Sequence, residues 1–374
     1  MAALTRRQGA LVALGTLYAA AVIPIGVHNG ADLANHLPLV ERLLTRQPPY
    51  AQPAGVGLWW PPFALLTLTP FALLARFSAP FAKGAFALLG VVFLIWTVAR
   101  FDQVRLTHLV LAIAAVAVPL ETNFEWLNWN TVLLALIVAA GLDVERKRDA
   151  RAGVWLGIAT ALKVFPGLLL VFAAYRHRWR TAVWGACVAV GLSVCALLPL
   201  GIADGLTSAQ DWLAQSASGS WVLVRRNQSL SALLGRLGAP HPWAIVGDLV
   251  LLGLAALVLR RSTSDRNIVH DLGIATVVAV LVSPIAWIHY YFLALPAWIA
   301  IISRPPVGRP RLVWVALVVA GIATSGLLTV WSYPSRVILQ EHSLFAWGGL
   351  LLLAVLLLER WTRHAPSLSA TGDA

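Results

Sequence analysis

Three ionisable residues stand in stretches of the sequence that are otherwise apolar or aromatic. Asp32 follows the first long apolar stretch, Lys163 lies near the middle of another, and His289 lies between Trp287 and Tyr290. Ionisable side chains are costly inside a membrane, so those that occur there are functional candidates by default. Their types indicate the chemistry: a carboxylate can accept a proton, and an ammonium or imidazole group can bind an anion.

Other polar residues are predicted to lie on the same, outer side of the membrane as these three. They are Asn35, His36, Glu125, Asn128, Asn130, Arg225, Arg226, Asn227, Gln228 and Tyr290.

Each candidate also has an ordinary structural alternative. Asp32 and Asn130 each begin an apolar helical pattern, so either side chain could simply cap a helix. The remaining alternatives are an interfacial packing residue for His36, a snorkelling side chain for Lys163, solvated loop charges for Arg225 and Arg226, an interfacial belt residue for His289, and interfacial aromatic anchors for Trp126 and Trp129.

The elements that must position these residues belong to a chain too apolar for a soluble protein. Of its 374 residues, 59% are apolar and 12% are charged, and the mean hydropathy is +0.77. Soluble domains are about 45–50% apolar and about 25% charged. The composition therefore predicts an all-α polytopic membrane protein, with roughly ten to twelve transmembrane or re-entrant helices at roughly 20 residues per span.

Charge and motifs exclude several classes of function. The net charge of +12 comes from short basic runs between apolar stretches, so no nucleic-acid partner is expected. The sequence contains no spaced His/Cys cluster, no glycine-rich nucleotide loop and no serine-elbow motif. We therefore expect no metal site formed by these motifs and no coupling to ATP.

Basic residues predict which ends of the apolar stretches face the cytoplasm, where Lys and Arg are in excess. Arg6 and Arg7 place the start of the first helix inside and residues 28–62 outside. An amphipathic helix from Asp32 is predicted on the outer surface, with these apolar positions on one face: Leu33, Leu37, Val40 and Leu44. The further apolar segments are 63–77, 80–99, 107–120, 131–142, 181–200, 242–259, 270–284, 292–302, 312–330 and 344–358, and the later outer loops are 121–130, 201–241 and 331–343.

The stretch 153–175 breaks the regular alternation because basic clusters flank it on both sides, at 146–151 and 176–180. A single helix would place one cluster outside and would hold Lys163 near the bilayer centre, at a cost of about 2.5–3.5 kcal/mol. A broken hairpin keeps both clusters inside and directs its apex, around Lys163 and Pro166, into an outward-facing cavity. We therefore predict the hairpin.

A set of short motifs occurs in a specific order along the chain. The motifs are Ala31-Asp32-Leu33, Pro49-Tyr50, Trp60-Pro61-Pro62-Phe63, Asn128-Trp129-Asn130, Ala161-Leu162-Lys163-Val164-Phe165-Pro166 with Trp179-Arg180 following, Asn227-Gln228-Ser229-Leu230, and Ser283-Pro284-Ile285-Ala286-Trp287-Ile288-His289-Tyr290. Because these motifs occur in this order, the chain resembles the polyprenol-phosphate-sugar-dependent glycosyltransferases of family 87. These are multi-spanning enzymes of the GT-C fold class and include mycobacterial mannosyltransferases of lipoglycan synthesis.

The chain departs from the family pattern at three places close to the expected site. The departures are Leu127-Asn128 where members commonly have Gly-Gln, Asn35-His36 where many have Val-Tyr, and Tyr290 where a second histidine often follows the first. They bear on the identity of the substrate rather than on the class of reaction.

The resemblance implies one membrane glycosyltransferase domain of the GT-C-like fold over residues 1–364, followed by a disordered cytoplasmic tail at 365–374. It implies transfer of a sugar, mannose above all, from a polyprenyl-phosphate donor to a glycolipid or glycan acceptor. The site would face outward from the cytoplasmic membrane of a bacterium, in contact with membrane lipid.

Polyprenyl phosphate is a good leaving group, so the reaction needs mainly a base for the acceptor hydroxyl and cations for the phosphate. The anomeric carbon would be inverted, and the lipid tail would leave beside segment 63–77. Asp32 and His289 are the expected catalytic residues. The expected roles are general base for Asp32, binding or orientation of the donor phosphate for His289, Lys163, Arg225 and Arg226, and substrate binding for Asn35, His36, Asn128, Asn130, Asn227, Gln228 and Tyr290.

Alternative functions remain open in the sequence. Arabinofuranose is an alternative donor sugar within the same class. A transporter or lipid flippase would use the same broken helix and membrane-depth lysine, although we find no inverted repeat. A non-catalytic assembly subunit is disfavoured because it has no need for a carboxylate opposite two bases. No cofactor is expected, and the acceptor, the linkage, the oligomeric state and the use of a divalent cation are left open.

Overall fold

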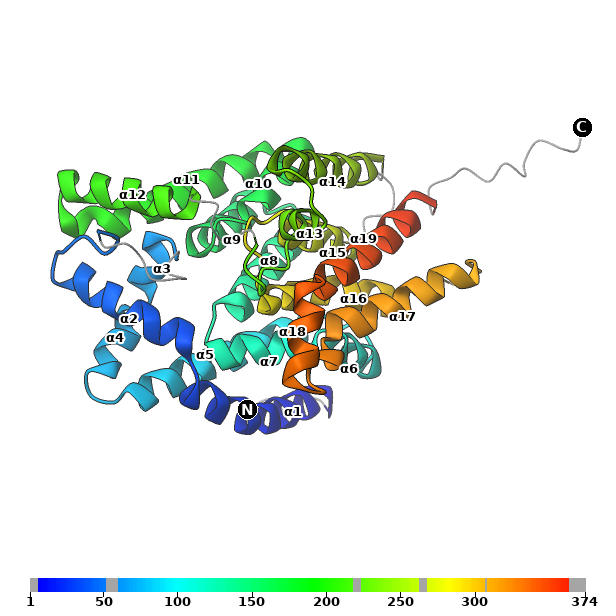
Figure 1. The fold of residues 1–374 in the computed structure, drawn as a ribbon, viewed down its shortest axis with the longest axis horizontal. Coiled ribbons are helices and arrows are strands. Elements are labelled where there is room, and N and C mark those ends of the chain that lie inside the picture. Colours follow the sequence, from blue (N-terminus) through cyan, green and yellow to red (C-terminus); the bar gives the residue numbers. More distant parts are fainter. Residues whose placement is uncertain (1–5, 52–59, 218–222, 262–267, 307, 363–374) are drawn as a thin grey trace, which may run out of the picture.

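The computed structural model describes residues 6–51, 60–217, 223–261, 268–306 and 308–362, and these ranges contain helices and no strand (Figure 1). The expected tail at 365–374 lies outside the described residues. The helices are α1 (Arg6–His28), α2 (Ala31–Leu44), α3 (Pro62–Thr67), α4 (Thr69–Ala75), α5 (Ala79–Ala99), α6 (Leu106–Ala114), α7 (Ala117–Trp126), α8 (Asn130–Glu145), α9 (Asp149–Leu162), α10 (Gly167–Tyr175), α11 (Trp179–Leu197), η1 (Leu198–Leu200), α12 (Ile202–Ala217), α13 (Leu230–Arg236), α14 (His241–Arg261), α15 (Ile268–Leu281), η2 (Ile288–Ala294), α16 (Leu295–Ser303), α17 (Arg311–Ser325), η3 (Leu327–Thr329), α18 (Tyr333–Glu341) and α19 (Leu344–Thr362).

Five helices within the described ranges are long and apolar enough to cross a membrane, namely α1, α5, α11, α14 and α19. Helices α6 and α7 form a sixth candidate span that is bent by 67° at its break. Shorter apolar helices, α15 and α17 among them, add to this set. The predicted all-α polytopic architecture is confirmed.

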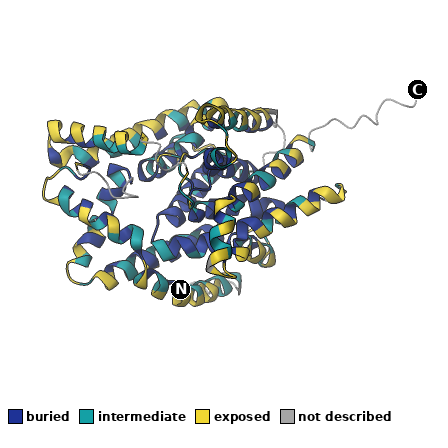
Figure 2. Cartoon of the chain, in the orientation of Figure 1, coloured by how far each residue is buried: buried dark blue, intermediate teal, exposed yellow. Residues whose placement is uncertain are grey.

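Apolar side chains cover the outside of the molecule as well as its interior. Figure 2 shows exposed residues along α1, α11 and α14, whereas α8, α15 and α16 are mostly buried between the other helices. Leu17, Val190 and Leu249 are 69%, 63% and 61% exposed. Exposing so much apolar surface to water would be unfavourable, so these faces are suited to lipid.

Helices α9 and α10 form the predicted broken hairpin, and the helical pattern is interrupted at residues 163–166. Arg178, after α10, donates a hydrogen bond of 2.6 Å to Asp149 at the start of α9. The two basic clusters therefore lie at the same end of the hairpin, as its prediction required.

Arginines predicted to be cytoplasmic bind partners in other segments predicted to be cytoplasmic. Arg7 at the start of α1 donates to the carbonyl oxygen of Phe101 beyond the end of α5, at 2.6 Å. Asp271 near the start of α15 accepts from Arg176 at 2.6 Å and lies 3.0 Å from Arg360 near the end of α19. These contacts join the ends that the arginine distribution assigns to one side, and Asp32 follows the opposite end of α1.

Three predicted outer loops contain helices, so their interpretation as loops was wrong. Helices α12 and α13 lie within 201–241, α18 lies within 331–343, and α7 continues through most of 121–130. A search for spans of about 20 apolar residues misses such short amphipathic helices. In α12, Ile202, Leu206 and Leu213 recur at helical spacing on an exposed side, although the overall composition is mixed.

The predicted amphipathic helix after the first span is confirmed as α2, but its buried face differs from the prediction. Leu44 is 39% exposed and Leu37 is only partly buried. Because α2 packs against α3, α4 and α7, its buried face includes residues that hydropathy alone did not select. The buried residues are Leu33, His36, Leu39, Val40 and Leu43.

Candidate active site

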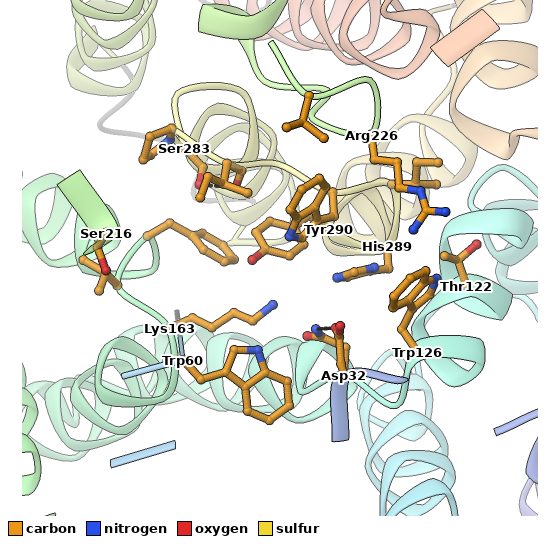
Figure 3. Close-up of a pocket in the computed structure, with 18 of the residues that line it drawn as sticks. Asp32, Trp60, Thr122, Trp126, Lys163, Ser216, Arg226, Ser283, His289 and Tyr290 are labelled. Carbon is orange, nitrogen blue, oxygen red and sulfur yellow. Dashed lines mark hydrogen bonds between the residues drawn. The ribbon is translucent and has the colours of Figure 1, made fainter. Parts of the chain in front are cut away.

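A cavity of about 580 Å³ lies among α2, α7, the break between α9 and α10, α12 and the segment before η2 (Figure 3). The structure places eight of the predicted site residues around it. They are Asp32, Asn35, Asn128, Lys163, Arg225, Arg226, His289 and Tyr290.

The junction between α1 and α2 positions Asp32. Gly30 has a φ of +46°, and its N–H donates to the carbonyl oxygen of Glu125 in α7 at 2.8 Å. A Cβ at Gly30 would lie 2.6 Å from the carbonyl oxygen of Gly26, so both the conformation and the close approach favour glycine. Helix α2 therefore begins at a fixed place beside α7.

Asp32 does not cap its helix, so that alternative was wrong. The N-cap position of α2 makes no side-chain hydrogen bond, and Asp32 Oδ2 instead accepts from Asn128 Nδ2 at 2.6 Å. Burial raises the pKa of Asp32 to about 6, although the Asn128 hydrogen bond and the charges of Lys163 and Arg226 lower it. A carboxylate with this pKa is still largely ionised at neutral pH and is well matched to general-base catalysis.

Leu127 turns the chain so that Asn128 reaches Asp32. It ends α7 in the left-handed region with a φ of +56°, a conformation that is unfavourable for a bulky residue. The following N–H, of Asn128, donates to the carbonyl oxygen of Asn123. Such backbone strain is often found at functional sites, where the surrounding packing maintains it.

Lys163 is buried at the apex of the hairpin, so the snorkelling alternative was wrong. Its side chain is 4% exposed, and Nζ donates to Asn130 Oδ1 at 3.1 Å. Nζ also lies 3.8 Å from the ring centroid of Tyr290, a distance suited to a cation–π contact. Phe165 stacks against the same tyrosine at 5.2 Å. The lysine is therefore held in place facing the cavity.

Asn130 joins the lysine to the histidine segment instead of capping α8. The N-cap of α8 makes no side-chain hydrogen bond. While Asn130 Oδ1 accepts from Lys163, Nδ2 donates to the carbonyl oxygen of His289 at 2.9 Å. His289 is 4% exposed and lines the cavity, so it is not a belt residue at the membrane surface. Its Nε2 is buried and has no hydrogen-bond partner among the described residues.

Four predicted substrate-binding residues, His36, Asn130, Asn227 and Gln228, do not line the cavity. Each of them instead makes at least one hydrogen bond within the protein. His36 donates from Nδ1 to the carbonyl oxygen of Asp32 and stacks on Trp60 with ring centroids 4.1 Å apart. Asn227 and Gln228 bind backbone groups of several segments, including those of Pro284, Ala286, Arg225 and Gln340.

Tryptophans that were predicted to be interfacial anchors have other roles. Trp129 is 4% exposed and packs against Phe86 and Trp60, so its interpretation as an anchor was wrong. Trp126 lines the cavity, and the Arg226 guanidinium carbon lies 5.0 Å from its ring centroid. Arg226 is thus a solvent-accessible residue of the cavity rather than an isolated loop charge.

Sequence reasoning missed several other residues around the cavity. Trp212 and Ser216 were missed because α12 was interpreted as a loop, and Arg336 was missed because α18 was interpreted in the same way. Trp60 belongs to a quoted motif but received no role. Within the described residues, no group of three His, Cys, Asp or Glu side chains is arranged to hold a metal ion.

The fold and the site define a polytopic, all-helical membrane protein in which one carboxylate and several cations surround a cavity. The chain belongs to glycosyltransferase family 87, whose model matches residues 59–284. It is therefore a membrane glycosyltransferase.

The chain is similar to mannosyltransferases of mycobacteria. The polyprenol-phosphate-mannose-dependent alpha-(1-2)-phosphatidylinositol mannoside mannosyltransferase of Mycolicibacterium smegmatis is 29% identical over 315 residues, which cover 76% of this chain and 68% of that protein. The protein of the same name from Mycobacterium tuberculosis is 26% identical over 277 residues, covering 67% of this chain and 63% of that protein. No solved structure matches the chain.

Proposed function

We propose that this chain transfers mannose from a polyprenyl-phosphate donor to a glycolipid acceptor on the outer face of the cytoplasmic membrane. The names of the relatives specify a polyprenol-phosphate-mannose donor and phosphatidylinositol mannoside acceptors. The observation that carries the proposal is that the Asp32 carboxylate and the buried Lys163 ammonium line the same cavity. The outward orientation is supported by the arginine-rich contacts at the opposite end of α1.

The reaction needs one proton transfer and one substitution. Asp32 removes the proton from the acceptor hydroxyl, and the resulting oxygen attacks the anomeric carbon of the donor sugar. The bond between that carbon and the phosphate oxygen breaks, and its electron pair goes to the phosphate. In-line attack inverts the anomeric centre, and Asp32 then releases its proton to water.

Lys163 is placed to stabilise the leaving group. A polyprenyl phosphate gains one negative charge as it departs, and a buried cation stabilises such charge strongly because little water screens it. Asn130 and Tyr290 hold the ammonium in place before the reaction. The unpartnered Nε2 of His289 is available for a hydrogen bond to a donor phosphate or sugar oxygen.

The lipid tail of the donor would leave the cavity beside α3 and α4. These short helices replace a full span here, and Trp60 and Pro61, immediately before α3, line the cavity. Leu73 and Phe77, at and beyond the end of α4, are 43% and 90% exposed. An apolar chain passing this way would contact apolar protein surface and lipid.

The experiment compares purified wild type with Asp32→Asn in transfer of labelled mannose from a short-chain polyprenyl-phosphate mannose to phosphatidylinositol mannoside. We expect the variant to lose at least about a hundredfold in turnover, because general-base catalysis contributes about 10²–10⁴-fold. Donor binding should be retained. Asp204→Asn is the matched control, since Asp204 is exposed on α12 and does not line the cavity.

Turnover by Asp32→Asn at the wild-type rate would refute the assignment of the base. Wild type that is inactive with mannose but active with the arabinofuranosyl donor would correct the sugar alone. Inactivity with both donors across a panel of acceptors would refute the proposed transfer reaction.

A further inference from the structure

Cations lie on both sides of Asp32 in the cavity. In Figure 3, Lys163 approaches Asp32 from one side, while Arg226 and Trp126 lie on the other, with Tyr290 and His289 between the two cations. Each cation packs against a different aromatic ring: Lys163 lies over Tyr290, and Arg226 lies over Trp126. They form two cationic regions rather than one cluster.

The charge around the cavity exceeds what one donor requires. The lining residues include four cations, Lys163, Arg225, Arg226 and Arg336, and one carboxylate, Asp32. Glu125 is a further carboxylate close to Arg336, at 3.9 Å. A sugar linked through a polyprenyl phosphate carries a single negative charge. Arg336 is offset by Glu125 and by Glu121, which also acts on it electrostatically. With Lys163 assigned to the donor phosphate, Arg225 and Arg226 are left for a second anion, such as a phosphodiester.

Two polar groups near Arg226 also lack partners. The Thr122 hydroxyl belongs to a side chain that is 3% exposed and lines the cavity, and it has no hydrogen-bond partner among the described residues. Arg225 Nε is buried and likewise without a partner within those residues. Buried polar groups of native proteins are nearly always paired, so the Thr122 hydroxyl on the cavity wall is available to pair with water or with a bound polar molecule.

The geometry of inversion decides which substrate each region binds. The leaving phosphate and the attacking oxygen must lie on opposite sides of the anomeric carbon, and the base must lie beside the attacking oxygen. If Lys163 binds the donor phosphate, the acceptor extends past Asp32 toward Arg226. Arg226, not Lys163, then faces the acceptor.

We propose that Arg226, with Arg225, Arg336 and Thr122, binds the phosphodiester of an anionic glycolipid acceptor. This inference rests on the proposed function and reassigns Arg225 and Arg226 from the donor phosphate to the acceptor. A guanidinium suits this role because its planar donors match phosphate oxygens in pairs. The ring of Trp126 lies beside the Arg226 guanidinium and limits its freedom before binding.

The test uses two acceptors that differ in charge. One is a short-chain phosphatidylinositol mannoside, and the other is octyl α-mannoside, which is uncharged. Wild type, Arg226→Gln and Arg226→Lys are compared in detergent with the same labelled polyprenyl-phosphate mannose. Arg180→Gln is the control, because Arg180 is an exposed arginine on α11 that does not line the cavity.

We expect Arg226→Gln to lower kcat/KM for the anionic acceptor by about ten- to a hundredfold, the range for losing a hydrogen bond to a charged group. At pH 8, where Asp32 stays ionised even without the Arg226 charge that lowers its pKa, the octyl mannoside reaction and the donor KM should stay close to wild type. Arg226→Lys should recover part of the loss, because a lysine keeps the charge without the paired donors. Retained transfer to the uncharged acceptor also shows that the variant is folded.

A higher donor KM in Arg226→Gln, or an equal loss with both acceptors, would overturn the inference and leave the proposed function standing. The same holds if wild type shows no preference for the anionic acceptor. If octyl mannoside is not used at all, the decision rests on whether the variant raises the KM of the acceptor or that of the donor. Failure of wild type with every donor and acceptor would overturn both proposals.

Discussion

Removing the hydrogen bond between Asn128 and Asp32 should change the pH at which the enzyme becomes active. Asn128 Nδ2 donates to Asp32 Oδ2 at 2.6 Å, and this bond stabilises the ionised carboxylate and lowers its pKa against the effect of burial. With the bond present the pKa of Asp32 is about 6. In Asn128→Ala the ionised form loses this support, so the base should become protonated at a higher pH.

The size of the effect follows from the strength of such bonds. A hydrogen bond to a charged group contributes about 1.5–3 kcal/mol, and 1.36 kcal/mol corresponds to one pH unit. The acid limb of the kcat/KM profile should therefore move upward by about one to two pH units. Water that enters the space left by the amide can donate a hydrogen bond to the carboxylate, so the upward shift should be near one pH unit. For a shift of one pH unit, the variant should be slower than wild type by about fivefold at pH 6, and the difference should narrow above pH 8.

The assay is mannose transfer from pH 5 to pH 9, with Asn123→Ala as the matched control. Asn123 is a buried asparagine within α7, the helix that ends just before Asn128, and its side chain makes no hydrogen bond to Asp32. Its variant should keep the wild-type midpoint even if its rate is lower. The reasoning would be refuted by an Asn128→Ala profile with an unmoved midpoint, or by an equal loss of rate at every pH.

Two further substitutions test the supports of the site and the fold. Asn130→Ala should raise the donor KM by about tenfold, because the amide that holds Lys163 Nζ is removed. The acceptor KM in initial-rate measurements should stay near wild type. A change confined to the acceptor KM would contradict this role. Gly157→Ala should lower the apparent Tm in detergent, because a Cβ there would lie 2.6 Å from the carbonyl oxygen of Gly185 where α9 and α11 pack together. Gly191→Ala on α11 is the control, because a Cβ at Gly191 meets nothing within 4 Å. Equal Tm values for the two variants would count against close packing of α9 and α11.

Much of the fold followed from local properties of the sequence. A long apolar stretch predicts a span whatever surrounds it, and the paired basic clusters around residues 153–175 predicted the broken hairpin. The short helices α12 and α18 were missed because their apolar residues form a narrow face within a mixed sequence. Their importance comes from where they pack, which hydropathy along the chain does not report.

The sequence alone determined that the protein is a helical membrane protein, that a carboxylate follows its first span, and that a lysine occupies the apex of a broken hairpin. The tertiary structure decided what the polar side chains do. At the start of a helix, an asparagine that caps and one that bonds across the molecule have the same local pattern. Asn130 is identified as the second kind only by its hydrogen bonds to Lys163 and His289, which are 33 and 159 residues away in sequence. Contacts at such separations arise from packing of whole helices, so only the folded chain reveals them.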